Sequence, residues 1–148
     1  MFNVILKSGK DASPRRFHPW IFSGAIKKIK TAAGQDAEPQ EGDLVRVTSN
    51  KGDFLGTGHY QNGSIAVRIL SFQDVEIDED FWTKRIKEAY ELRQQIHLTD
   101  NKSTNIYRLI HAEGDGLPGL ILDYYAGTVV VQSHSIGMHY AKDIIVKA

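Results

Sequence analysis

The sequence contains no cysteine, and this absence removes several kinds of chemistry at once. Disulfide bonds, thiolate nucleophiles and cysteine-ligated zinc or iron–sulfur sites are excluded. No apolar run approaches the roughly 20 residues that a membrane-spanning helix needs, and no secretory signal is recognisable at the amino end. We therefore expect a cytoplasmic protein with no membrane attachment.

Recognisable catalytic motifs are equally scarce. Residues 114–119 match the G-x-G-x-x-G spacing of dinucleotide-binding loops, but Pro118 and a strand-like apolar run stand where a helix should open. His111-Ala112-Glu113 matches half of a zinc-deaminase signature whose other half requires cysteine. The sequence therefore predicts no catalytic residue, no cofactor and no metal ion in this chain.

Acidic residues are nearly absent from the first thirty positions, where Asp11 stands alone against seven lysines and arginines. Residues 1–72 hold ten basic and six acidic residues, a net charge of +4, whereas residues 73–148 hold eight and twelve, a net charge of −4. A local basic excess is typical of a surface that binds phosphate or another anion. An ordinary solvated face is the alternative.

Hydrophobic periodicity predicts an α+β protein with domains at residues 1–72 and 73–148. In the first domain, short alternating segments between turns predict a small, mostly antiparallel β barrel with one helical turn at 13–16. Gly56 and Gly58 within one of its strands predict a bulge or a close backbone approach. The strands are expected at residues 3–7, 25–30, 43–48, 54–60 and 64–70.

The second domain begins after an acidic stretch, which suits the start of a helix. Apolar residues recur at helical spacing over residues 81–97. Three short strands and a single C-terminal helix complete this small α/β domain, and the tight turn at Ala126-Gly127 predicts an antiparallel pair. The strands are expected at 106–112, 120–125 and 128–134, and the last helix at 136–148.

The segment from Arg15 to Trp20 interleaves cations with aromatic rings. Arginine contacts phosphate through two N–H groups and stacks on bases, and aromatic rings stack on unpaired RNA bases. Trp20 and Phe22 are expected in the barrel core, because large aromatic side chains are mostly buried. The exposed candidates for RNA binding are Arg15, Arg16, His18, Lys27, Lys28 and Arg68.

A second candidate site is the loop at residues 113–119, where Glu113 and Asp115 stand among glycines and a proline. A rigid loop that projects two carboxylates can border an active site completed elsewhere. A solvated turn is the alternative. We take Glu113 and Asp115 as candidates for a substrate-cleft or interdomain loop.

Several stretches together resemble one known family. They are Arg16–Ile26, Gly42–Val47, Phe54–Tyr60, Ser64–Leu70, Tyr107–Tyr125 and Val129–Gln132. In this order they are similar to the ribosomal RNA large-subunit methyltransferase I family. The resemblance implies an N-terminal PUA domain that binds RNA, a small α/β domain, and a Rossmann-like catalytic domain beyond this chain.

The resemblance also implies a chemistry for the full-length parent, which uses S-adenosylmethionine to methylate carbon 5 of a cytosine in 23S ribosomal RNA. Such chemistry uses a cysteine thiolate, which this chain lacks. By resemblance, Arg16, His18 and their basic neighbours lie near the RNA groove, and the loop of Glu113 and Asp115 faces the catalytic domain or the substrate cleft. The expected partners are ribosomal RNA and the missing methyltransferase domain, with a homodimer left open.

We therefore expect the RNA-recognition portion of a larger enzyme, inactive by itself. One alternative is a free-standing PUA-type RNA-binding module, which a gene ending after Ala148 would favour. The other is a protein-interaction domain without an RNA role, in which alanine at Arg15 and Arg16 leaves RNA retention unchanged.

Overall fold

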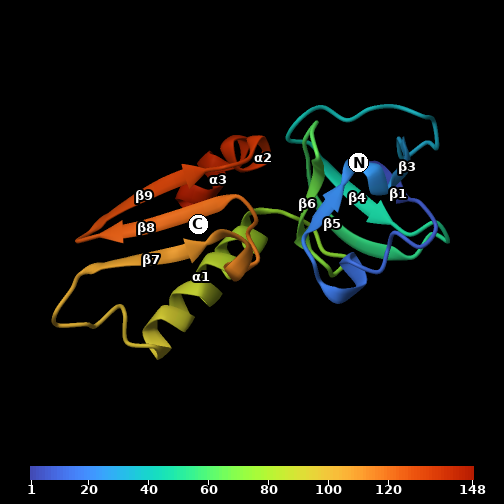
Figure 1. The fold of residues 1–148 in the computed structure, drawn as a ribbon. Coiled ribbons are helices and arrows are strands. Elements are labelled where there is room, and N and C mark those ends of the chain that lie inside the picture. The colour runs from blue at the N-terminus through green and yellow to red at the C-terminus, as the bar shows by residue number, and fades with distance from the viewer. The chain divides into compact units, whose positions relative to one another are not determined.

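The computed structural model describes residues 1–148, which form two compact units, Met1–Val75 and Glu76–Ala148 (Figure 1). Each unit combines β-strands with short or long helices, so the expected α+β class is confirmed. No helix combines the length and the apolar character that crossing a membrane requires.

The first unit is a six-stranded sheet that curls around its own core (Figure 1). Its elements are β1 (Phe2–Leu6), η1 (Pro14–Arg16), β2 (Trp20–Phe22), η2 (Ser23–Ala25), β3 (Ile26–Lys30), β4 (Leu44–Thr48), β5 (Phe54–Tyr60) and β6 (Ile65–Ser71), where η marks a 3-10 helix. The strand order is β2-β6-β5-β4-β1-β3, and only β1 and β4 run parallel. The barrel expected from the sequence is thus an open, barrel-like sheet whose edges are β2 and β3.

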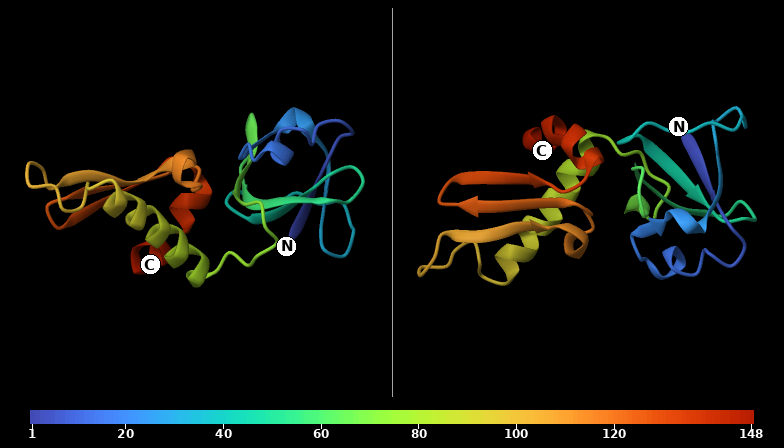
Figure 2. Two further views of the ribbon diagram at one scale, coloured as in Figure 1. Left: turned by 90° about the horizontal axis from the view of Figure 1, so that it is seen from below. Right: turned by 45° about the horizontal axis from the view of Figure 1, so that its top comes forward.

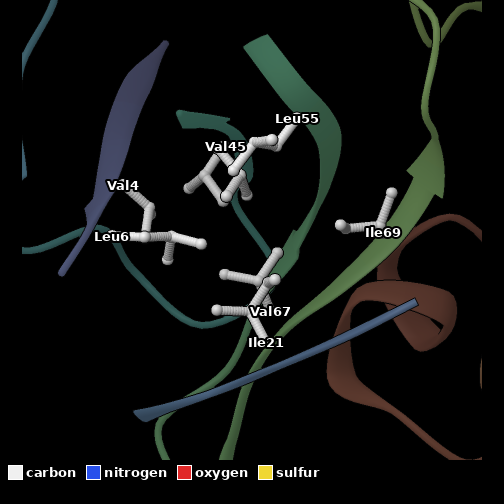
Figure 3. Packing of buried hydrophobic residues seen from close by; sticks show 8 residues of the cluster. Val4, Leu6, Ile21, Val45, Leu55, Val67 and Ile69 are labelled. Atoms are coloured by element: carbon white, nitrogen blue, oxygen red, sulfur yellow. The ribbon is translucent and has the colours of Figure 1, made fainter. Parts of the chain in front are cut away.

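Aliphatic side chains fill the inside of this curl. Figure 3 shows side chains from β1, β2, β4, β5 and β6 turned toward one another. Burying such side chains stabilises the unit by roughly 1.5–3 kcal/mol each, which makes this cluster its main source of stability. The cluster consists of Val4, Leu6, Ile21, Val45, Val47, Leu55, Val67 and Ile69.

The expectation that Trp20 and Phe22 anchor this core was wrong. Successive side chains of a strand point to opposite faces, and in β2 Ile21 takes the inward position, where it is 2% exposed. Phe22 is 49% exposed and Trp20 is half-buried. Strand alternation therefore overrides the general tendency of large aromatic side chains to be buried.

Gly58 marks a close backbone approach between β5 and β6. A Cβ atom on Gly58 would lie 2.1 Å from the backbone oxygen of Arg68. The pairing register of the two strands shifts between Thr57 and Gly58. The bulge or close approach predicted from Gly56 and Gly58 is confirmed, and only glycine fits this position without moving the strands.

The second unit places helices on one side of a three-stranded antiparallel sheet of order β7-β8-β9 (Figure 2). The long helix begins within the acidic stretch, where the Asp78 side chain caps it by accepting a hydrogen bond from the Phe81 N–H. The elements are α1 (Glu79–Gln95), β7 (Ile106–His111), η3 (Ala112–Asp115), β8 (Leu120–Tyr125), β9 (Thr128–Ser133), α2 (Ile136–Tyr140) and α3 (Lys142–Lys147).

The single C-terminal helix expected over residues 136–148 is instead two short helices. They meet at Ala141, whose φ and ψ of −79° and −1° separate α2 from α3. Gly137 lowers the intrinsic helix propensity of this segment, and helices so short depend on packing. Met138 and Ile145, both buried, supply that packing.

Candidate nucleic-acid interface

The 3-10 helix η1 presents two arginines to solvent. Pro14 stands at its start, where the fixed φ of proline suits a helical turn. Phe17 closes it in the left-handed conformation, with φ of +62°, and its N–H donates to the Pro14 carbonyl over 3.0 Å. Arg15 and Arg16 are exposed, as the sequence analysis expected.

Arg15, however, is held by two carboxylates. Its Nε donates to Asp11 over 2.8 Å, and its Nη2 donates to Asp53, 38 residues further along the chain, over 2.5 Å. These hydrogen bonds lower the pKa of both carboxyl groups and raise the pKa of the guanidinium. Much of the charge of Arg15 is therefore offset within the protein.

Basic side chains from distant parts of the first unit bind to the turn between β4 and β5, residues 49–53. Besides Asp53, which binds Arg15 from η1, it contains Asn50, whose Oδ1 accepts a hydrogen bond from Lys27 Nζ of β3 over 2.8 Å. Lys51 of the same turn also helps to lower the pKa of Asp53. Lys51 was not predicted to bind RNA, because in the sequence it is a single cation between two expected strands.

Two further predicted residues carry charges without a carboxylate partner. Arg16 donates from Nε to the Ala12 carbonyl over 3.3 Å, and the exposed side chain of Lys28 has no hydrogen bond or ion pair. We call the exposed cations of η1, β3 and the β4–β5 turn the basic cluster: Arg15, Arg16, Lys27, Lys28 and Lys51. Hydrogen bonds to Asp53 and Asn50 tie Arg15 and Lys27 to that turn. With Asp11 and Asp53 included, these groups carry a net charge of +3, because five cations stand against two carboxylates.

His18 and Arg68 form a separate group around β2. Trp20 is paired with Arg68 across the β2–β6 ladder, and the His18 ring lies edge-on to the Trp20 ring at 5.7 Å. The Trp20 N–H donates to His18 Nδ1 over 3.2 Å, and Arg68 donates to Gln61 over 3.1 Å. The structure therefore divides the six predicted RNA-binding residues between two groups.

An aromatic groove lies beside η1 and has a volume of about 410 Å³. Phe17, which is 72% exposed, meets Phe72 edge-on with ring centroids 5.3 Å apart. The sequence shows aromatic rings among the arginines, but no role was predicted for Phe17. The lining consists of Pro14, Arg15, Phe17, Phe54, Leu55 and Phe72.

The acidic loop of the second unit is built differently from the projecting loop that the sequence suggested. Asp115 turns inward, where both carboxylate oxygens accept hydrogen bonds from Arg93 of α1 over 2.6 and 2.7 Å. The two side chains are only 7% and 9% exposed. Glu113 is the exposed carboxylate of this loop, so the two candidates differ in their access to a ligand.

The G-x-G-x-x-G match at residues 114–119 also has a structural explanation. Gly119 has φ of +86°, and a Cβ there would lie 2.9 Å from Ser135 Oγ. Strand β8 begins at the next residue, Leu120, so no helix N-terminus stands where a pyrophosphate would bind. These residues do not fit an adenosyl or dinucleotide cofactor. No three potential metal-ligand side chains converge anywhere in the chain.

Known proteins match this chain both in the sequence of its first unit and in the fold of both units. Residues 4–72 match the family described as PUA-like domain. Solved structures with the same fold include a putative SAM-dependent methyltransferase from Streptococcus mutans, at TM-score 0.81 and 19% identity, covering 99% of this chain and 36% of that one. A putative methyltransferase in complex with SAH matches with the same TM-score, identity and coverage.

Closer relatives share the name ribosomal RNA large subunit methyltransferase I. The Vibrio cholerae protein is 40% identical over 98% of this chain, and the Shewanella frigidimarina protein is 42% identical over 97%. In both, the match covers 35% of the relative, so the chain spans about a third of their length. Over nearly its whole length, therefore, the chain is similar to part of the proteins named ribosomal RNA large subunit methyltransferase I, and residues 4–72 form a PUA-like domain.

Proposed function

We propose that this chain is the RNA-recognition portion of an S-adenosylmethionine-dependent methyltransferase that modifies large-subunit ribosomal RNA. The observation that carries the proposal is the basic cluster on the PUA-like unit, with its net charge of +3. Relatives named as ribosomal RNA methyltransferases supply the class of RNA. RNA phosphates attract such clusters from a distance and release bound counterions on contact.

The members of the cluster contribute unequally. Arg16 and Lys28 reach phosphates at the lowest cost, because neither must leave a carboxylate first. Arg15 must weaken its hydrogen bonds to Asp11 and Asp53 before it can bind a phosphate. Its ion pair with Asp53 instead ties η1 to the β4–β5 turn, and its ion pair with Asp11 holds the start of η1.

Methyl transfer belongs, in this proposal, to the two thirds of the full-length relatives that this chain does not span. Bound S-adenosylmethionine would supply the methyl group there. This chain contributes no cysteine thiolate to add to a cytosine ring, and residues 114–119 do not fit the cofactor. Carbon 5 of a cytosine as the acceptor is the finer part of the proposal and rests on the family resemblance.

The proposal is tested by measuring the affinity of the 148-residue chain for fragments of large-subunit ribosomal RNA. In the double variant Arg16→Gln, Lys28→Gln we expect affinity to fall about tenfold near physiological salt, because two phosphate contacts are lost. The matched control, Lys84→Gln with Lys87→Gln, removes the same charge from exposed positions of α1 and should change affinity by less than about twofold. Equal losses in both variants, or no binding by the unmodified chain, would contradict the proposal.

A further inference from the structure

The aromatic groove beside η1 has the form of a site for one flat ring. Three of the chain's six phenylalanines line it, Phe17, Phe54 and Phe72. The groove, about 410 Å³ in volume, is open to solvent along much of its surface. We propose that this groove holds one unpaired base of the bound RNA, stacked against Phe17, an inference that rests on the proposed RNA-binding function.

The backbone of Phe17 is the first argument for the site. Its φ of +62° lies in the left-handed region, which bulky side chains rarely adopt. Glycine or asparagine usually occupies a position that closes a helical turn in this way. The ring is 72% exposed, so burial does little to offset the strain. Strain held at an exposed ring is typical of residues that contact a ligand.

Ring geometry is the second argument. Phe17 and Phe72 meet edge-on, with an interplanar angle of 89°, and such a pair leaves ring faces uncovered. The Phe54 ring is instead covered by the Arg46 guanidinium, 4.4 Å from its centroid, and Arg46 is fixed by two hydrogen bonds of 2.7 Å to Asp74. The Phe54 ring is therefore covered and held in place, whereas Phe17 has exposed ring surface on which a base can stack.

Charge selects a nucleotide over an apolar peptide side chain as the occupant. Arg15 lines the groove, Arg16 precedes Phe17, and Lys51 lies close to the carboxylates that hold Arg15. A nucleotide can place its flat ring against the phenylalanines and its phosphate against these cations. An aliphatic side chain would contact only the phenylalanines. The groove and the basic cluster are therefore continuous through Arg15 and Arg16.

The lining also predicts how selective the site is. Apart from Arg15, its side chains are hydrocarbon, so no carboxamide or carboxylate is present to read the edge of a base. The Arg15 guanidinium is engaged by Asp11 and Asp53. Stacking alone accepts any base that is free of its partner strand. The groove should therefore distinguish single-stranded from duplex RNA and should show little preference among the four bases.

The test uses the full chain and a short single-stranded RNA that carries 2-aminopurine, whose fluorescence is quenched when its ring stacks. Phe17→Gly suits the left-handed backbone, so it should leave the melting temperature unchanged or raise it. It should lower affinity for the single strand about tenfold and abolish the quenching. Phe17→Tyr should retain both. Phe22→Leu, a change at an exposed phenylalanine outside the groove, is the control and should have no effect.

Two distinguishable outcomes would count against the inference. If the chain binds RNA but Phe17→Gly binds as tightly as the unmodified chain, the base site is wrong and the proposed function stands. The same result is expected if the groove receives an apolar peptide segment instead. If the unmodified chain binds neither single-stranded nor duplex RNA, the proposed function fails and the base site fails with it.

Discussion

Arg93 and Asp115 form a buried bidentate ion pair that ties helix α1 to the loop before β8. Both carboxylate oxygens are bound, at 2.6 and 2.7 Å, and Arg93 Nε also donates to the Arg108 carbonyl over 3.0 Å. The His111 N–H donates to Asp115 as well, over 2.5 Å. These four hydrogen bonds join α1, strand β7 and the loop before β8.

Removing one partner of this pair should destabilise the second unit severely. Asp115→Asn leaves the Arg93 charge buried without compensation, and we expect the free energy of unfolding to fall by about 3–5 kcal/mol. Urea denaturation followed by circular dichroism measures the change. Asp143→Asn, at an exposed position of α3, is the control and should stay within about 0.5 kcal/mol. A similar small effect for Asp115→Asn would show that the ion pair does not support the loop.

Neutralising an acidic partner of Arg15 should strengthen RNA binding. Asp53→Asn releases the Arg15 guanidinium from one of its two carboxylates, so the cation can meet a phosphate. We expect tighter binding and a slope of log Kd against log salt that steepens by up to about 0.7–0.9, the value for one added phosphate contact. Fluorescence anisotropy with labelled ribosomal RNA measures both quantities.

Asp36→Asn is the matched control for this experiment. It makes the same change of net charge in the same unit, at an exposed residue that has no ion pair with Arg15. A general charge effect would raise the affinity of both variants equally, and that result would contradict a specific role for Arg15.

Alanine at Gly58 should disrupt the first unit. Its Cβ would stand 2.1 Å from the Arg68 backbone oxygen, so β5 and β6 must move apart and lose hydrogen bonds. We expect a loss of about 3 kcal/mol or more and a melting temperature lower by at least about 10 °C. Gly24→Ala meets nothing within 4 Å and should be neutral or slightly stabilising. Equal melting temperatures for the two variants would mean that the strands accommodate the methyl group.

The first unit should lose stability as pH falls from about 6.5 to about 4. Burial of His59 lowers its pKa from 6.5 to about 4, so the unfolded chain binds a proton in this range that the folded chain does not. Stability is complete above the unfolded pKa and falls by about 3 kcal/mol toward pH 4. Urea denaturation between pH 7.5 and 4.5 measures the loss, and His59→Gln should flatten the profile. An equally steep profile in that variant would rule out His59 as the cause.

Local signals in the sequence were sufficient for most of the fold. The strands at residues 54–60 and 120–125 were predicted with their observed bounds, because turn residues flank an alternating or apolar run on both sides. The C-terminal helix was drawn too long, because nothing local marks the bend at Ala141. The sequence did not identify Ile21 as the core residue of β2, because strand alternation, and not side-chain size, places it inward.

For the candidate interface, the sequence predicted which residues are exposed cations but not which ion pairs they form. Arg15 was singled out correctly as an exposed cation, but its partner Asp53 lies 38 residues away, beyond the reach of any local pattern. The same limit hid the pairing of Asp115 with Arg93. A positive φ at Phe17 has no sequence signal, because such positions are normally marked by glycine or asparagine.

The salt dependence of RNA binding tests the central claim most directly. The affinity of the unmodified chain for a single-stranded fragment of large-subunit ribosomal RNA would be measured across salt concentrations from about 50 to about 300 mM. Three phosphate contacts by the basic cluster predict that log affinity falls with log salt at a slope near −2, and that Arg16→Gln with Lys28→Gln reduces this slope by about 1.4. Binding that does not change with salt, or a double variant with the slope of the unmodified chain, would contradict the account.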